Sequence, residues 1–189
     1  KWYNADFVRS YTDLPFLVRK DTLKRLRASE LVVGYRGGLK KEGPSRTVQH
    51  LTDEQYAKIG DFCIYDEGQK AVRPITRDQL GPRMSADGLK PALSYSGRVK
   101  FADGKEVEVI TLWDAYGIHL KDYDLDTVSQ ITGADRDSIE RLAKDIWDTT
   151  VAGHAVAIHV GEGINHWFHA TLANRAQYLP IMLTGQLGR

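Results

Sequence analysis

The stretch that decides the fold is Ala155-Val156-Ala157-Ile158-His159-Val160, followed directly by Gly161-Glu162-Gly163-Ile164-Asn165-His166-Trp167-Phe168-His169. The first part is a β-branched run and predicts a strand. The residues from Ala170 to Leu183 then predict a helix. The order of strand, glycine turn, polar cluster and helix is typical of an open α/β sheet, in which ligands bind just beyond the carboxyl end of a strand.

Several side chains of this turn could contact a ligand. Gly161 and Gly163 carry no Cβ, so the backbone can approach a bound molecule closely. Asn165, His166 and His169 offer amide and imidazole groups near the start of the following helix, whose free N–H groups favour anions. The alternative interpretation is a tight strand–helix connection that binds nothing.

The two histidines do not by themselves predict a metal site. His166 and His169 are three residues apart and could share one helical face. Their spacing matches no zinc motif, and no third ligand stands nearby in the sequence. We interpret Trp167 and Phe168 as core residues in preference to a stacking platform.

A second helix is predicted before the strand. Asp135 or Asp137 is expected to cap it, and its apolar residues recur at i, i+3, i+4 and i+7: Ile139, Leu142, Ala143 and Ile146. Helix, strand, loop and helix in this order indicate a Rossmann-like unit with a parallel strand. We therefore assign residues 123–189 to a Rossmann-like α/β unit, and the fold class is α/β.

Residues 1–122 are expected to form an irregular α+β region with hairpin insertions. Phe62–Tyr65 should pair with Ala71–Ile75, and residues 92–101 should pair with residues 105–111 through Ala102-Asp103-Gly104. Residues 34–46 predict a flexible surface loop, and residues 52–56 predict the start of a helix.

Composition limits the possible functions. The 189 residues are 42% hydrophobic, which allows one sizeable core. The chain contains 26 Lys and Arg residues and 25 Asp and Glu residues. This near-neutral charge gives no footprint for nucleic acid, so we expect no nucleic-acid partner. The sequence contains no run of about 18 or more apolar residues, which a membrane-spanning helix would need. The single Cys63 excludes an internal disulfide and any cysteine-ligated cluster held wholly by this chain.

Three groups of residues resemble one known family. Gly161–His169, Asn174-Arg175-Ala176 and Leu183-Thr184-Gly185 resemble the molybdopterin oxidoreductase (DMSO reductase) superfamily. The branch is the nitrate reductase-like one, which holds respiratory nitrate reductases, nitrite oxidoreductases, and perchlorate and selenate reductases. The segment Asp6–Val18 resembles the same branch, and Val128–Gly133 is a more generic match. The chain as a whole is most similar to the alpha (catalytic) subunits of nitrite oxidoreductases.

The resemblance implies an internal fragment of a larger molybdoenzyme of nitrification. Such an enzyme oxidises nitrite to nitrate at a molybdenum bis(molybdopterin guanine dinucleotide) and passes the electrons to iron–sulfur clusters. The implied partners are nitrite and nitrate, an iron–sulfur beta subunit, and a membrane-associated or haem gamma subunit. The expected location is the periplasmic side of a membrane, with the cytoplasmic side as the alternative. The fragment alone is expected to be inactive.

The resemblance also assigns roles within the loop. Asn165 and His166 become the candidate catalytic residues. His166 would orient the carboxylate that ligates molybdenum, or would donate to nitrite or nitrate. The candidate cofactor-binding residues are Gly161, Gly163, Asn165, His166, Trp167, His169, Thr184 and Gly185. The metal and cluster ligands of the family match nothing in this chain, so no metal ligand is expected here.

Two alternatives stay open at this point. The chain could belong to a nitrate, perchlorate or selenate reductase, since these enzymes share the loop motif. It could also be a non-catalytic α/β domain that binds a nucleotide or acts as a scaffold. Near the start of the chain, Thr12 and Asp13 are interpreted as turn formers; the alternative places them on the funnel to an active site.

Overall fold

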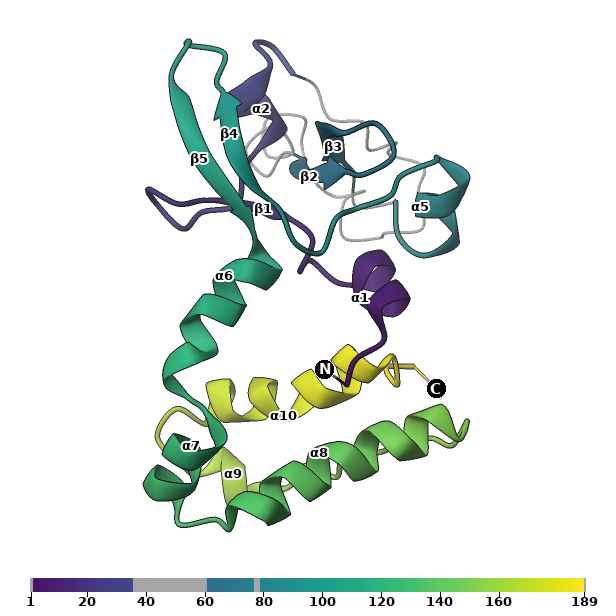
Figure 1. Cartoon of the computed structure of the whole chain (residues 1–189), viewed down its shortest axis with the longest axis vertical. Helices are drawn as coiled ribbons and strands as arrows, with labels where there is room; N and C mark the ends of the chain where they lie inside the picture. The colour runs from purple at the N-terminus through teal and green to yellow at the C-terminus, as the bar shows by residue number, and fades with distance from the viewer. Residues whose placement is uncertain (1, 36–60, 77–78, 189) are drawn as a thin grey trace. The chain divides into compact units, whose positions relative to one another are not determined.

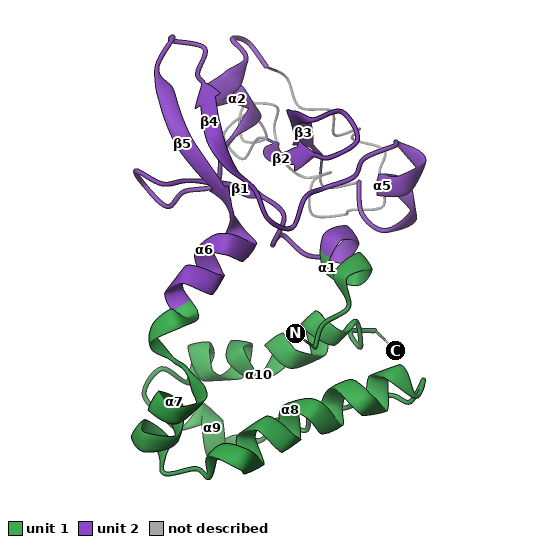
Figure 2. Ribbon diagram, viewed as in Figure 1, with its two compact units in different colours: residues 1–8, 120–189 green, residues 9–119 purple. Residues whose placement is uncertain are grey.

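The computed structural model describes residues 2–35, 61–76 and 79–188. The described residues form two compact units, Arg9–His119 (the sheet unit) and Lys1–Val8 together with Leu120–Arg189 (the helical unit) (Figure 2). The loop predicted at 34–46 lies almost wholly outside the described residues, and so does the helix start predicted at 52–56. The domains predicted at 1–122 and 123–189 remain a prediction.

Two antiparallel sheets form the sheet unit (Figure 1). Strands β1 (Leu17–Arg19), β5 (Glu106–Thr111) and β4 (Ser96–Lys100) pair in that order. Strands β2 (Phe62–Asp66) and β3 (Ala71–Ile75) form a separate hairpin. Both hairpins predicted from the sequence are therefore confirmed.

Local chemistry explains the β4–β5 hairpin. Gly104 adopts a positive φ of 89°, which a glycine tolerates without strain. The Asp103 carboxylate accepts a hydrogen bond from the Lys105 N–H at 2.9 Å, and this bond closes the turn. Along β5, Val107 and Val109 are buried while Glu106 and Glu108 are exposed, as the two-residue period of a strand requires.

The core of the sheet unit lies where these strands meet. One cluster comprises Leu17, Leu26, Ala28, Cys63, Val99 and Val109. A second comprises Ile64, Ile75, Met84 and Leu89, with Phe16 packed against it. Cys63 is fully buried and free, and burial raises the pKa of its thiol to about 12.

The described residues of the sheet unit also form short helices. They are α2 (Ala28–Leu31), α5 (Pro82–Ala86) and α6 (Leu112–His119), while α1 (Ala5–Tyr11) runs across the division between the units. Gly81 precedes α5 with a φ of +53°, and a Cβ there would lie 2.4 Å from the Tyr11 hydroxyl. A side chain at position 81 would therefore require the Tyr11 ring to move and would strain the backbone.

The turn after α1 supports the structural interpretation of Thr12 and Asp13. Thr12 is buried, and its hydroxyl accepts a hydrogen bond from the Leu14 N–H at 3.2 Å. The Asp13 carboxylate pairs with Arg25. Both polar side chains therefore have partners within the sheet unit.

The helical unit contains α7 (Leu125–Thr132), α8 (Arg136–Val151), α9 (Glu162–Asn165) and α10 (Ala170–Thr184), after a 3₁₀ turn at Leu120–Asp122. Asp135 caps α8, because its carboxylate accepts a hydrogen bond from the Ser138 N–H at 2.9 Å. Gly133 ends α7 in the left-handed conformation. The predicted helices are confirmed, and α10 runs one residue beyond its predicted end.

The described residues do not confirm the parallel strand predicted at Ala155–Val160. This segment belongs to no strand, and every strand pair in the described part of the chain is antiparallel. The physical reason is that a strand requires a neighbour to bond its backbone groups. The segment still alternates as a strand does: Val156, Ile158 and Val160 are half-buried, and the residues between them are exposed.

The apolar faces of the helical unit are only partly covered. Along α8, Ile139 and Ile146 are half-buried, but Leu142 is 64% exposed. The amphipathic period of α8 was predicted correctly, while part of its apolar face has no cover within the described residues.

Candidate functional site

The loop between the extended segment and α10 carries most of the candidate residues. Gly161 precedes the single turn of α9, and His166 follows it. His169 begins α10 with a φ of +64°, a left-handed conformation that is unusual for any residue other than glycine. The Ala170 N–H bonds the Trp167 carbonyl at 3.0 Å, so the backbone between them makes a tight turn.

Gln186 holds the start of the extended segment in place. Its side chain is buried, and its amide nitrogen donates to the Thr150 hydroxyl at 3.0 Å and to the His154 carbonyl at 3.4 Å. Its amide oxygen accepts from the Val156 N–H at 3.3 Å. One side chain thus joins the end of α8, the extended segment and the residue that follows α10 and its cap.

Asn165 is held by a residue of α10. The Asn174 amide nitrogen donates to Asn165 Oδ1 at 2.9 Å and to the Ala170 carbonyl at 3.0 Å. Asn174 Oδ1 is buried and has no hydrogen-bond partner among the described residues. Asn165 itself is exposed, so its remaining amide group can reach a ligand.

His166 lies beside a carboxylate of the same loop. Its Nε2 is 3.8 Å from Glu162 Oε2, one turn away. The imidazole is 75% exposed and the carboxylate 92% exposed, so this pair contributes little to stability. Both groups are accessible to a molecule that approaches the loop.

The interpretation of Trp167 and Phe168 as core residues is wrong. Trp167 is 74% exposed and Phe168 is 89% exposed. The Phe168 ring contacts the imidazole of His169, with ring centroids 4.2 Å apart. These two adjacent aromatic side chains therefore leave an apolar surface uncovered within the described residues.

Thr184 and Gly185 lie at the other end of α10 from the loop. The helix has 15 residues, so about 21 Å along its axis separates its two ends. Thr184 is buried, and its hydroxyl donates to the Pro180 carbonyl at 2.8 Å. A Cβ at Gly185 would lie 3.1 Å from Phe7 Cγ. Both residues have packing roles, and they are not brought together with Asn165 and His166.

The described residues hold no group of three or more His, Cys, Asp or Glu side chains that could bind a metal ion. The loop instead supplies hydrogen-bonding and aromatic groups: the amide of Asn165, the imidazoles of His166 and His169, and the rings of Trp167 and Phe168. Such groups can bind and orient a flat heterocycle or an oxyanion.

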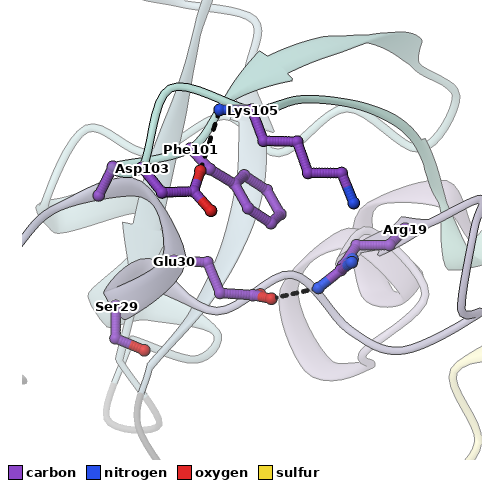
Figure 3. A pocket seen from close by; sticks show the side chains of 7 residues that line it. Arg19, Ser29, Glu30, Phe101, Asp103 and Lys105 are labelled. Atoms are coloured by element: carbon purple, nitrogen blue, oxygen red, sulfur yellow. Dashed lines mark hydrogen bonds and ion pairs between the residues drawn. The ribbon is translucent and has the colours of Figure 1, made fainter.

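A surface pocket of about 410 Å³ lies in the sheet unit, lined by Arg19, Ser29, Glu30, Phe101, Ala102, Asp103 and Lys105 (Figure 3). Arg19 lies across the Phe101 ring at 5.0 Å, and it pairs with Glu30 at 2.6 Å and with Asp21 at 2.7 Å. Lys105 approaches Asp21 at 3.9 Å. Because both cations already have carboxylate partners, we interpret the pocket as a structural ion-pair network.

Sequence reasoning missed three residues of the site. Glu162 and Gln186 were not singled out, and Asn174 was noted only as part of a motif. Gln186 and Asn174 reach their partners through the fold, which no local pattern reveals. The spacing of four residues between Glu162 and His166 was a signal that could have been used.

The chain is similar along nearly its whole length to alpha subunits of oxyanion reductases. It is 28% identical over 187 residues to the respiratory nitrate reductase subunit alpha of Haloferax mediterranei, covering 98% of this chain and 17% of that protein. It is 27% identical over 198 residues to the perchlorate reductase subunit alpha of Dechloromonas aromatica, covering 100% of this chain and 20% of that protein.

A third relative is the respiratory nitrate reductase 1 alpha chain of Escherichia coli, 24% identical over 247 residues, which cover 99% of this chain and 20% of that protein. The chain therefore spans a fifth or less of the length of these relatives. No protein-family model matches it.

Proposed function

We propose that this chain is part of the catalytic subunit of a molybdopterin-dependent oxidoreductase that acts on an oxyanion of nitrogen. The relatives are alpha subunits of nitrate and perchlorate reductases, and the similarity extends from one end of the chain to the other. The single observation that supports a role in the active site is the exposed loop Asn165–His169, which gathers amide, imidazole and aromatic groups.

The residues of the loop suit a pterin and an oxyanion better than they suit a metal ion. Exposed rings such as Trp167 and Phe168 can stack on a flat heterocycle. Asn165 and His166 can donate hydrogen bonds to its polar edge or to an anion. The molybdenum ligands and the iron–sulfur ligands would come from other parts of the longer polypeptide.

When bound, the cofactor supplies the two-electron oxygen-atom transfer, and this chain supplies binding and proton handling. Oxidation of nitrite to nitrate takes its oxygen from water and releases two protons and two electrons, and the electrons pass to the iron–sulfur clusters. Asn165 would donate to the anion or to a pterin oxygen. His166 would take up one proton at Nε2, close to the carboxylate of Glu162 3.8 Å away.

We propose nitrite oxidation as the physiological direction, with iron–sulfur clusters as the electron acceptors. This proposal depends on the resemblance to nitrite oxidoreductases. The second candidate is the reduction of nitrate or perchlorate, and the names of the relatives favour it. The two candidates share the loop and differ in the redox potentials of the partners.

The proposed partners are an iron–sulfur beta subunit and a membrane-associated or haem gamma subunit. None of the helices in the described ranges is long and apolar enough to cross a membrane. We propose attachment to a membrane through those partners, on the periplasmic side, with the cytoplasmic side as the alternative. We also propose that strands of the longer polypeptide pair with Ala155–Val160 and so complete the Rossmann-like sheet.

The test replaces His166 by alanine in the full-length subunit with its cofactor. Nitrite oxidation and nitrate reduction are both measured per molybdenum, together with the molybdenum and pterin content. We expect turnover to fall by about 10²-fold or more, as the loss of a proton-transfer group does, while the metal content stays near that of the wild type.

The matched control is His119→Ala, since His119 is an exposed histidine of the sheet unit. This variant should keep wild-type turnover. Unchanged nitrite and nitrate turnover in His166→Ala would contradict the role of the loop. The ratio of the two directions at a fixed acceptor potential decides between nitrite oxidation and nitrate reduction.

A further inference from the structure

The side chain of Asn174 determines which end of the Asn165 amide faces outward. The Ala170 carbonyl can only accept hydrogen bonds, and it lies 3.0 Å from one end of the Asn174 amide. That end must therefore be the nitrogen, because two acceptor oxygens at this distance would repel each other.

The orientation of Asn165 then follows from that of Asn174. The Asn174 nitrogen also points at Asn165, at 2.9 Å, so the atom of Asn165 that faces it must be the oxygen. Asn165 Oδ1 is thus engaged, and its Nδ2 makes no hydrogen bond within the described ranges. The exposed group of Asn165 is consequently an N–H donor pair.

We infer that Asn174 is a positioning residue that makes Asn165 a hydrogen-bond donor toward an acceptor oxygen of the ligand. That oxygen belongs to a bound oxyanion or to a pterin carbonyl, which share the same acceptor chemistry. The inference rests on the proposed function, because it concerns the same loop. It adds that Asn165 donates the hydrogen bond and that the ligand accepts it.

The buried oxygen of Asn174 is consistent with this role. Both hydrogens of the Asn174 amide are used, and its Oδ1 has no partner among the described residues. A residue selected only to stabilise α10 would not leave a buried acceptor unpaired, because such an atom costs free energy. The unpaired Asn174 oxygen costs free energy, and the same arrangement of the Asn174 amide fixes the orientation of Asn165.

The experiment uses the full-length enzyme with its cofactor and compares Asn174→Asp with Asn174→Leu. An aspartate can only accept, so it would turn the Asn165 amide and present its oxygen to the ligand. A leucine would leave Asn165 free to rotate. Gln177→Leu is the matched control, because Gln177 is a half-buried amide on the same helix.

The readouts are the KM for nitrite and for nitrate, kcat per molybdenum, and the molybdenum and pterin content. If the acceptor is the anion, Asn174→Asp raises KM about tenfold with kcat retained, and Asn174→Leu raises it less. If the acceptor is the pterin, the cofactor content falls in the same order and KM stays constant. Gln177→Leu should change neither.

Two results separate the failure of this inference from the failure of the proposed function. If Asn165→Ala changes KM or cofactor content while both Asn174 variants match the wild type, the positioning role of Asn174 is overturned. The proposed role of the loop in ligand binding is then retained. If Asn165→Ala changes none of these measurements, the loop does not contact the ligand. The proposed function of the loop and the positioning role of Asn174 are then both refuted. Equal loss of kcat in all variants, with KM and cofactor content unchanged, would show a structural role for Asn174 and would also overturn the inference.

Discussion

The buried carboxylate of Asp66 should be one of the most sensitive positions of the sheet unit. Its side chain is fully buried at the end of β2, and Oδ2 accepts a hydrogen bond from Arg73 Nη1 at 2.9 Å. Oδ1 accepts from the Gly68 N–H at 2.9 Å and from the Lys90 N–H at 3.3 Å. These bonds join the β2–β3 hairpin to the segment that follows α5.

The size of the effect follows from what each substitution removes. Asp66→Asn keeps an oxygen for the two backbone donors but places an amide nitrogen opposite Arg73. Because a hydrogen bond to a charged group contributes roughly 1.5–3 kcal/mol, we expect a loss of about 2 kcal/mol. Asp66→Ala leaves all three donors unpaired and should cost about 4 kcal/mol of unfolding free energy.

The pH dependence carries a definite sign. Burial raises the pKa of the Asp66 carboxyl, but the hydrogen bonds from Arg73 and from the backbone outweigh it and hold the pKa below its ordinary value. The ionised carboxylate therefore stabilises the fold above the pKa of the unfolded chain, and this contribution disappears as the pH falls through the lower, folded pKa. The difference between wild type and Asp66→Asn should shrink on acidification from pH 7.

The assay is urea unfolding of the 189-residue chain between pH 2.5 and 7. Trp113 lies in the sheet unit, and replacing Trp2, Trp147 and Trp167 by phenylalanine leaves it as the reporter of that unit. Glu67→Gln, which changes an exposed carboxyl next to Asp66, is the control and should change stability by less than about 0.5 kcal/mol. An Asp66→Asn variant as stable as this control, or with the same pH profile as the wild type, would refute the reasoning.

Three further predictions concern other parts of the chain. Cys63 should resist alkylation by iodoacetamide at pH 8 in the folded chain and react in 6 M guanidinium, because burial raises the pKa of its thiol to about 12; rapid labelling without denaturant would contradict the buried core. Gly81→Ala should lower the unfolding free energy by more than about 2 kcal/mol, since the new Cβ meets Tyr11 and φ is positive, while Gly88→Ala, with positive φ but open space, should lose only about 1 kcal/mol; equal melting temperatures for the two would disprove the clash. Gln186→Leu should release the extended segment at a cost of about 2–3 kcal/mol, measured as faster hydrogen exchange at the Val156 amide; unchanged exchange would show that the segment is held by other contacts.

Local chemistry explains which parts of the fold were predictable from the sequence. The β4–β5 hairpin needs only the Asp103-Gly104 turn and an alternating strand, and α8 needs only its Asp135 cap and an apolar period. Both signals lie within a few residues. The strand predicted at Ala155–Val160 depends on neighbours that the described residues do not contain, so β propensity alone could not establish it.

The candidate site shows the same division. The sequence predicted the polar loop and its glycines as a site because their order after a β-branched run is a local pattern, and their role in binding stays a prediction. Trp167 and Phe168 were predicted to be buried and are exposed, because burial depends on what covers a side chain and not on its type alone. The sequence could not show that Asn174 holds Asn165, because a turn and the start of a helix had to fold before their amides could meet.

The pairing of β1 with β5 has a consequence for chain length. Leu17 lies opposite Thr111, so the sheet closes a long loop whose two ends are fixed by the register of these strands. The entropic cost of closing a loop rises only with the logarithm of its length, and doubling the enclosed segment would cost about 0.6 kcal/mol. Insertions in the turns between these strands should therefore be tolerated at little thermodynamic expense, provided that they leave the strands and the two core clusters intact.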